Sequence, residues 1–424
     1  MISTFARETI PAVVTSHAED CALLRNVRAV LVRAPHVRLK ELHRIDSRIA
    51  AHLDGLAVAG ERGGAACRAG LARAGAGETF ALAVRAIEER DDATLDRAVA
   101  LAASDADARR GLLSAIGWVS PSQLHGIAQG LLSSPEPLRC ELGLAACRLQ
   151  RVDPGPVLAG SVRSKGPLVG LAAVKAASEL GRIDLLEDVL GAISSWDGAV
   201  AREAAEAACL LGDRGVSLRA LELLAAAEGS PAACADPWLI LATDLEHGRE
   251  LVRQMARGAR DDAKRWRRAI RAGGLLGDAR LVPWLVEQMD DDTRARLAGE
   301  SFSLITGADL AALDLERKPP EGIPGGPSDD PDDDDVAMDE DDSLPWPDRA
   351  KVAGWWERHK HEFPLDQPCF MGGPSTIERM DEVLRTGFQR QRHLAARRRV
   401  LLAPGARLFP TCAPAWRQAR LLGL

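Results

Sequence analysis

The side chains best suited to binding or reaction gather in three stretches of this sequence. The first is 38–58, where leucine and isoleucine at helical spacing predict an amphipathic helix. Its other face mixes charged and imidazole groups, namely His43, Arg44, Asp46, Arg48, His52 and Asp54. Such a mixture suits an interaction site, for which the candidates are Arg44, Arg48, His52 and Asp54. A solvated helix face crossed by salt bridges is the simpler interpretation.

The second stretch is rich in tryptophan and histidine, LPWPDRAKVAGWWERHKHEFP at 344–364. We expect a helix over 348–361, and Trp355 and Trp356 are candidates for contacts with a partner. His359 and His361 are two residues apart, so on a helix they point in different directions. We therefore predict no metal site here.

The third stretch is basic: no acidic residue occurs from Val383 to Leu424, while nine arginines do. We expect a helix that starts near Ser375, runs to Pro404 and docks through Phe388 and Leu394, leaving the arginines exposed. The arginines are at 385, 390, 392, 397, 398, 399, 407, 417 and 420. The interaction candidates are Gln389, Arg390, Gln391, Arg392, Trp416 and Arg417.

An acidic run precedes these two stretches, with ten carboxylates between Asp329 and Asp342. Together with its prolines and glycines, this composition predicts a disordered linker over 318–343. The run lacks the glycine and the spaced glutamate of an EF-hand loop, so calcium binding is not expected. Either the run folds back and masks the basic stretch, or it acts only as a tether while the arginines pair with other carboxylates or stay solvated.

Sequence patterns of catalysis are missing. The chain has no G-x-x-x-x-G-K-[ST], G-x-S-x-G, H-E-x-x-H or S-x-x-K motif, and no glycine fingerprint follows a strand pattern. We predict no catalytic residues, no cofactor, no metal and no enzymatic activity.

The elements that position these stretches follow from a repeat, seen most clearly in 269–289. This segment reads as two short helices that meet at Gly277, with Asp278 capping the second. Ala269, Ala272 and Leu276 line one face of the first helix, and similar small or apolar residues recur at the same offsets from five other anchors. The anchors are 117, 150, 181, 212, 247 and 277, close to 31 residues apart.

This pattern resembles HEAT-type repeats over about 81–315. The resemblance implies an all-α fold, an α-solenoid of stacked helix pairs with an extended concave binding surface. The predicted organisation is an N-terminal helical cap at 1–80, a repeat array at 81–317, a disordered acidic linker at 318–343 and a helical C-terminal segment at 344–424.

Composition sets further bounds. Of the 424 residues 46% are hydrophobic, and the net charge is -7, which argues against a nucleic-acid binder by bulk charge. The eight cysteines include no C-x-x-C motif, and most lie in apolar helical runs, as expected for free thiols in a reducing compartment. No signal peptide or membrane-spanning run is visible. We expect a cytoplasmic protein that does not insert into membranes.

Words near both ends carry a more specific resemblance. They are RAVLVRAP, RIDSRIAAHLDGLAVAG, LPWPDRAKVAGWW, GFQRQRHLAA and LFPTCAPAWRQARLL. Together with the repeats, the chain resembles a family of bacterial HEAT-repeat proteins encoded beside type VI secretion genes. The resemblance implies an accessory role, as a chaperone, co-chaperone or adaptor whose partner is an effector, PAAR-tip, spike or chaperone protein.

The function expected from the sequence is thus a non-catalytic protein-binding scaffold or adaptor. The alternative is a HEAT-like nucleic-acid-binding protein that uses the arginines of 385–420 on phosphates. A third, minor interpretation is an enzyme of the bilin-lyase kind, a class that also carries HEAT-like repeats.

Overall fold

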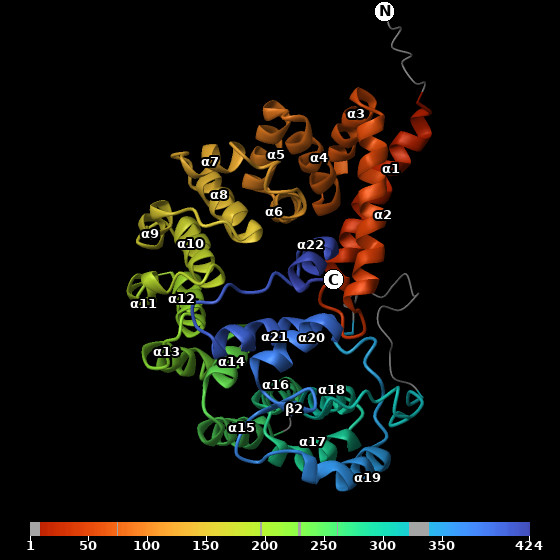
Figure 1. Cartoon of the computed structure of the whole chain (residues 1–424), viewed down its shortest axis with the longest axis vertical. Coiled ribbons are helices and arrows are strands. Elements are labelled where there is room, and N and C mark those ends of the chain that lie inside the picture. Colours follow the sequence, from red (N-terminus) through yellow and green to blue (C-terminus); the bar gives the residue numbers. More distant parts are fainter. Residues whose placement is uncertain (1–8, 74, 196, 228–229, 261, 322–338) are drawn as a thin grey trace, which may run out of the picture. The chain divides into compact units, whose positions relative to one another are not determined.

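Helices make up nearly all of the regular structure. The computed structural model describes residues 9–73, 75–195, 197–227, 230–260, 262–321 and 339–424 (Figure 1). Within these ranges lie 22 α-helices and one hairpin of two short strands, so the prediction of an all-α protein is confirmed. The chain divides into two units, unit 1 with Met1–Asp188 and Arg407–Leu424, and unit 2 with Val189–Ala406.

Unit 1 contains the first helices of the chain and its last one. Its helices are α1 Pro11–Leu31, α2 Leu39–Val58, α3 Glu61–Gly70, α4 Ala76–Glu89, α5 Asp92–Ser104, α6 Ala106–Trp118, α7 Ile127–Leu132, α8 Pro137–Gln150, α9 Pro156–Val162, α10 Pro167–Glu179 and α22 Ala415–Leu422. Two 3-10 turns lie at Leu71–Arg73 and Ile183–Leu185. Helix α11, Leu186–Ala192, begins in unit 1 and ends in unit 2.

Unit 2 contains the remaining helices and the hairpin. Its helices are α12 Gly198–Leu210, α13 Val216–Ala225, α14 Ser230–Ala242, α15 Leu245–Ala259, α16 Ala263–Leu276, α17 Val282–Glu287, α18 Ala295–Thr306, α19 Arg349–His359, α20 Ile377–Thr386 and α21 Gln389–Leu402. The strands are β1 Cys369–Phe370 and β2 Gly373–Pro374, and 3-10 turns lie at Ala279–Leu281, Gln288–Asp290 and Lys360–Glu362. Within the described ranges, none of the helices combines the length and apolar character needed to cross a lipid bilayer.

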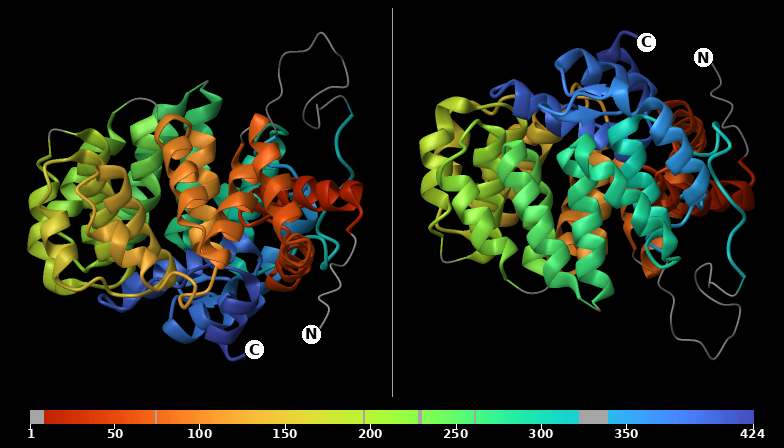
Figure 2. Two further views of the ribbon diagram at one scale, coloured as in Figure 1. Left: turned by 90° about the horizontal axis from the view of Figure 1, so that it is seen from above. Right: turned by 90° about the horizontal axis from the view of Figure 1, so that it is seen from below.

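Helix pairs stack in both units. In unit 1, α4, α6, α8 and α10 form a row of successive contacts, and α5, α7 and α9 pack beside them (Figure 2, left). In unit 2, α12, α14, α16 and α18 form a similar row, accompanied by α13, α15 and α17 (Figure 2, right). Fully buried alanines at the predicted facing positions, such as Ala173, Ala204 and Ala269, let neighbouring helices approach closely.

Glycines in the left-handed backbone conformation follow the ends of several helices in these rows. Gly181, Gly212 and Gly277 have positive φ, as predicted for residues just past a helix. At Gly277 a side chain would also collide with the carbonyl oxygen of Cys369, which would lie 2.3 Å from its Cβ. The carboxylate of Asp278 accepts a hydrogen bond from the Arg280 N–H at 3.0 Å, which confirms its predicted capping role.

Two of the six predicted anchors do not mark helix ends. Gly117 lies inside α6, which ends one residue later at Trp118. His247 lies in the first turn of α15, where its N–H donates to the capping carboxylate of Asp244. These two anchors therefore do not coincide with helix ends, although Leu112, Ile116, Leu239 and Ala242 at the predicted offsets are buried.

The C-terminal part of unit 2 donates hydrogen bonds to carbonyl groups at the carboxyl ends of the stacked helices. The Cys369 N–H donates to the carbonyl of Gly277 at 2.7 Å, and the Met371 N–H to that of Leu304 at 2.7 Å. The single helix predicted from Ser375 to Pro404 is in fact two helices, α20 and α21. The break falls at Gly387, where an added Cβ would lie 2.8 Å from the carbonyl of Val383.

In unit 1, the last residues of the chain donate hydrogen bonds to carbonyl groups at the carboxyl ends of α10 and α6. The Leu408 N–H donates to the carbonyl of Glu179 at 3.0 Å. The guanidinium of Arg417 donates to the carbonyls of Gly117, Trp118 and Val119 at 2.8–3.3 Å. A cation at these carbonyls also complements the negative end of the α6 dipole.

The predicted linker over 318–343 falls largely outside the described residues, which exclude 322–338. Its described C-terminal end differs from the prediction, because Asp339, Glu340 and Asp341 form ion pairs with arginines of α16 and α18. The Asp341 residue is only 2% exposed. This end of the acidic run is therefore an ordered part of unit 2.

Leucines of the predicted repeat fill the core of unit 2, with Leu211 1% and Leu276 3% exposed. We predict that Leu211→Ala or Leu276→Ala lowers the free energy of unfolding by about 2–5 kcal/mol, because each leaves a cavity. Urea denaturation measures the loss. The control Leu223→Ala changes a side chain that is 77% exposed and should stay within about 0.5 kcal/mol. Equal stability of all three variants would show that the leucines are not in the core.

Candidate functional site

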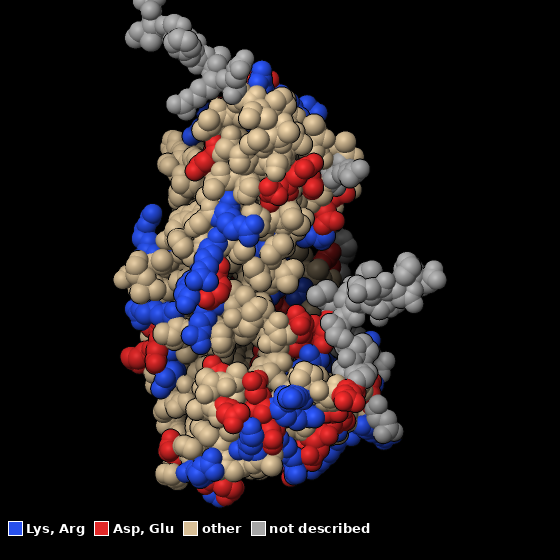
Figure 3. All heavy atoms as spheres, turned by 90° about the vertical axis from the view of Figure 1, so that its right-hand side faces the viewer, with Lys and Arg blue, Asp and Glu red and all other residues tan. Residues whose placement is uncertain are grey.

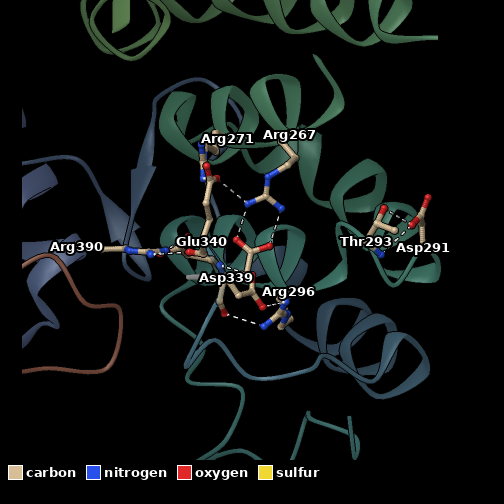
Figure 4. Close-up of polar contacts among 10 residues, drawn as sticks. Arg267, Arg271, Asp291, Thr293, Arg296, Asp339, Glu340 and Arg390 are labelled. Atoms are coloured by element: carbon tan, nitrogen blue, oxygen red, sulfur yellow. Dashed lines mark hydrogen bonds and ion pairs between the residues drawn. The ribbon is translucent and has the colours of Figure 1, made fainter. Parts of the chain in front are cut away.

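Four arginines of unit 2 hold an acidic triplet of the same chain (Figure 4). We call Arg267, Arg271, Arg296 and Arg390 the arginine cradle, and 339–341 the acidic triplet. The cradle comes from three helices, since Arg267 and Arg271 lie on α16, Arg296 on α18 and Arg390 on α21. Elements far apart in the sequence thus build one surface of positive charge.

Asp341 is the buried anchor of the triplet. Both of its carboxylate oxygens accept hydrogen bonds from Arg267, each at 2.6 Å, in a bidentate pair. The backbone carbonyl of Asp341 accepts a further bond from Arg296 at 3.0 Å. Only 3% of the Asp341 side chain is exposed, so water hardly reaches this pair.

The other two carboxylates bind more superficially. Asp339 accepts a hydrogen bond from Arg296 at 2.5 Å. Glu340 pairs with Arg271 at 2.9 Å and with Arg267 at 3.3 Å, yet 67% of its side chain is exposed. The triplet therefore combines one buried carboxylate with two that solvent can reach.

The elements place the cradle by simple rules. Arg267 and Arg271 are four residues apart on α16, so they stand on one face of that helix. α18 packs against α16 and brings Arg296 next to them. Arg390 lies in the first turn of α21, where it pairs with Glu300 of α18 at 3.2 Å and donates to the Glu340 carbonyl at 2.9 Å.

The ring of Trp346 packs against one arginine of the cradle. The Arg296 guanidinium lies over the ring of Trp346 at 4.6 Å, and that of Arg317 lies over it at 5.6 Å. Trp346 is 9% exposed, and its carbonyl accepts the Arg317 N–H at 2.8 Å. This contact fixes the chain a few residues after the triplet.

The electrostatics match this geometry. The hydrogen bond to Asp341 raises the pKa of Arg267. The hydrogen bond from Arg271 lowers the pKa of Glu340. Burial alone would raise the pKa of Asp339, but the Asp341 N–H and Arg296 outweigh it, and the pKa is lowered. The cradle thus stabilises ionised carboxylates, as expected of a site that binds acidic groups. In the described part of the chain, no group of three or more His, Cys, Asp or Glu could hold a metal ion.

The candidates on α2 remain largely at the surface. Arg44, Arg48 and Asp54 are exposed, and the half-buried His52 ring lies 3.0 Å from that of His17, measured between the two Nδ1 atoms. Asp46, which the sequence placed on the same polar face, is instead fully buried.

Asp46 is buried because it has partners from two directions. One carboxylate oxygen pairs with the Arg28 Nε at 2.5 Å. The other accepts the Ala415 N–H at the start of α22, at 2.7 Å. Its placement on a solvated helix face was therefore wrong.

The tryptophan candidates pack against core side chains. Trp356 is 6% exposed and packs against Phe363, and Trp355 packs edge-on against Phe302. Trp416 lies edge-on to Trp118 with ring centroids 4.8 Å apart. Trp356 is therefore buried, while Trp355 and Trp416 are partly exposed and pack against the core with the rest of their rings.

The candidates at the start of α21 are also mostly internal. Leu394 is buried as predicted, but Gln389 and Arg392 are fully buried as well. The Arg392 Nε donates to the Leu384 carbonyl in the last turn of α20 at 2.8 Å. Gln391 caps α21 by accepting the Phe388 N–H at 2.9 Å. The prediction that this helix leaves its arginines exposed is therefore wrong for Arg392 and Arg398.

The cradle was missed from the sequence except for Arg390. Arg267 and Arg271 lie in RWRRAIRAGG, where four-residue spacing of arginines was a visible signal. The acidic run was noticed, but its partner was sought in the C-terminal stretch. The triplet binds mainly arginines of α16 and α18, and Arg390 alone joins them from that stretch.

We predict a distinctive pH dependence for Asp339→Asn/Glu340→Gln/Asp341→Asn. Because the Asp341 side chain is buried against Arg267, the triple change should lower the free energy of unfolding at pH 7 by about 1–3 kcal/mol. The pKa values of Asp339 and Glu340 are lowered, so their contribution is complete above their ordinary values near pH 4. It is lost as the pH falls through the lowered values.

Urea denaturation between pH 7 and pH 2.5 measures the difference between wild type and variant. We expect it to be constant above about pH 5 and to shrink below about pH 4. A charge-matched control, Glu19→Gln/Asp54→Asn/Glu287→Gln, changes exposed carboxylates. A difference that grows on acidification, or that the control reproduces, would contradict the assigned ion pairs.

Comparisons with protein-family models, with curated proteins and with solved structures found no match to this chain. The resemblance to HEAT-repeat proteins of type VI secretion clusters therefore stays a hypothesis.

Proposed function

We propose that this protein is a non-catalytic scaffold whose arginine cradle binds acidic segments of a protein partner. The observation that carries the proposal is the acidic triplet held by the cradle. The triplet contacts the cradle as a bound acidic peptide would, but it belongs to the same chain. Planar guanidinium groups in bidentate contact select carboxylates, and their spacing on three helices selects a short run of them.

The bound triplet is suited to exchange with a competitor. Glu340 is mostly exposed, and its pair with Arg271 is a surface ion pair of small net stability. A partner would first engage Arg271 and then displace Asp341 from Arg267. Because the triplet is tethered, it competes at an effective concentration on the order of millimolar. A successful partner must therefore offer more than three carboxylates, for example apolar contacts beside them.

The more specific version of the proposal rests on the sequence resemblance alone. In it, the protein is a chaperone-like or co-chaperone-like cytoplasmic factor for type VI secretion, and the partner is an effector, PAAR-tip, spike or chaperone protein. The cradle adds one requirement, since the partner must present an acidic segment.

The nucleic-acid alternative has less support than the scaffold. It needs the arginines of 385–420 on a common surface, but Arg392 and Arg398 are buried. Arg417 is bound to the carbonyls at the end of α6. The guanidinium groups that remain at the surface are too few for a continuous phosphate-binding track.

Binding of the chain's own acidic peptide in trans tests the cradle. A fluorescein-labelled peptide of residues 336–345 should bind the Asp339→Asn/Glu340→Gln/Asp341→Asn variant about ten-fold or more tighter than wild type, because the tethered competitor is gone. Adding Arg267→Met to that variant should abolish binding, and raising the salt concentration should weaken it. Fluorescence anisotropy measures the affinity.

The matched control peptide carries the same three changes to Asn and Gln and should not bind. Equal affinity of the acidic peptide for wild type and variant would contradict a cradle that the triplet occupies. Binding that survives Arg267→Met would place the peptide elsewhere.

Affinity capture from a native host tests the secretion hypothesis separately. Wild type and the triplet variant serve as paired baits. Recovery of a spike, PAAR-tip, effector or chaperone protein, enriched on the variant, is the expected result. Recovery of housekeeping proteins alone would remove the secretion hypothesis, while the peptide experiment would still decide the fate of the cradle.

A further inference from the structure

Helix α1 in unit 1 exposes a row of apolar side chains. Leu23, Val27 and Val30 are 61%, 38% and 69% exposed. Their spacing of four and three residues places them on one face of the helix. Cys21 and Leu24 of the same helix are buried in the core. The exposed apolar row is therefore not needed for packing within unit 1. Single exposed apolar residues are common, but a row along one face marks an interaction surface.

Helix α2 exposes a row of basic side chains. Lys40, Arg44 and Arg48 follow one another at four-residue spacing, and all three are exposed. Among the described residues, neither Arg44 nor Arg48 makes an ion pair. Figure 3 shows a band of Lys and Arg side chains on the side of the molecule where these helices lie.

The two rows run along the same edge of the α1–α2 pair. The Nδ1 of His52 on α2 lies 3.9 Å from a carboxylate oxygen of Asp20 on α1. Leu23 is three residues after Asp20 and Arg48 is four residues before His52, so each is one turn away on that side. Arg28 pairs with Asp46 farther along, which keeps the antiparallel helices in register. The apolar row is thus flanked by the basic row.

We infer that this edge, formed by Leu23, Val27 and Val30 with Lys40, Arg44 and Arg48, docks an acidic amphipathic helix of a protein partner. The apolar row spans about 10 Å, two turns of a helix. A partner helix with apolar residues at i, i+3 or i+4, and i+7 covers it, and Asp or Glu beside them meets the arginines. The inference uses none of the cradle residues and does not depend on the cradle's function.

Charge and side-chain types decide against other occupants. A second copy in a two-fold contact would bring the basic row against itself. A membrane surface calls for aromatic or larger apolar anchors, and this row has one leucine and two valines. Nucleic acid would leave the apolar row uncovered. Acidic Glu19 and Asp20 lie at one end of the row, so the positive potential is strongest toward Val30 and favours one orientation of the partner helix.

Fluorescence anisotropy with a defined peptide tests the inference. The probe is a fluorescein-labelled helix of three heptads with Leu at the first and fourth positions and Glu at the fifth and seventh. We expect Arg44→Glu/Arg48→Glu to weaken binding about ten-fold or more, and Val27→Ser/Val30→Ser to weaken it to a similar extent. The charge-matched control Arg97→Glu/Lys165→Glu changes exposed residues of unit 1 outside this edge and should bind like wild type.

All substitutions are at exposed positions, and circular dichroism confirms that the variants stay folded. No binding of the probe to wild type, or equal weakening by the control pair, would overturn the inference. Binding to vesicles of phosphatidylcholine and phosphatidylserine in place of the peptide would assign the edge to a membrane. Self-association that Val27→Asp abolishes would assign it to a second copy. Either result would also overturn the inference.

Discussion

The last turn of every α-helix ends in carbonyl groups without donors inside the helix, and stacking many helices multiplies this deficit. In this protein the C-terminal residues supply much of what is missing. In unit 2 the N–H groups of Cys369 and Met371 and the guanidinium of Arg398 serve α16 and α18. In unit 1 Leu408 and Arg417 serve α10 and α6. The arginine-rich end of the chain is therefore first a structural component of both units.

The sequence predicted what depends on local rules. Helix content, the buried alanines and leucines, the positive φ of Gly277 and the cap at Asp278 all follow from spacing and residue type. The buried state of Asp46 and Arg392 could not be predicted, because their partners are set by packing. Asp46 meets the N–H of Ala415, a residue 369 positions away, and its polar type alone placed it in solvent.

The cradle shows the same limit at the level of function. The acidic run and the four-residue spacing of Arg267 and Arg271 were both readable, but the match between them required the packing of α16 against α18. Trp346, seen in the sequence only as part of an aromatic cluster, fixes the triplet by lying under Arg296. Amino-acid composition therefore does not reveal the cradle, because the arginines and the acidic triplet that binds them are each ordinary when considered separately.

The central claim is that arginines of the C-terminal stretch are internal donors rather than an open basic surface. Arginine-selective NMR of the full chain tests it through the hydrogen exchange of each Nε–H. Buried Arg392 and Arg398 should exchange far more slowly than the exposed Arg420 in the same sample, and addition of a short DNA duplex should leave their signals unshifted. Exchange of Arg392 and Arg398 as fast as that of Arg420, or shifts of both on adding DNA, would contradict it.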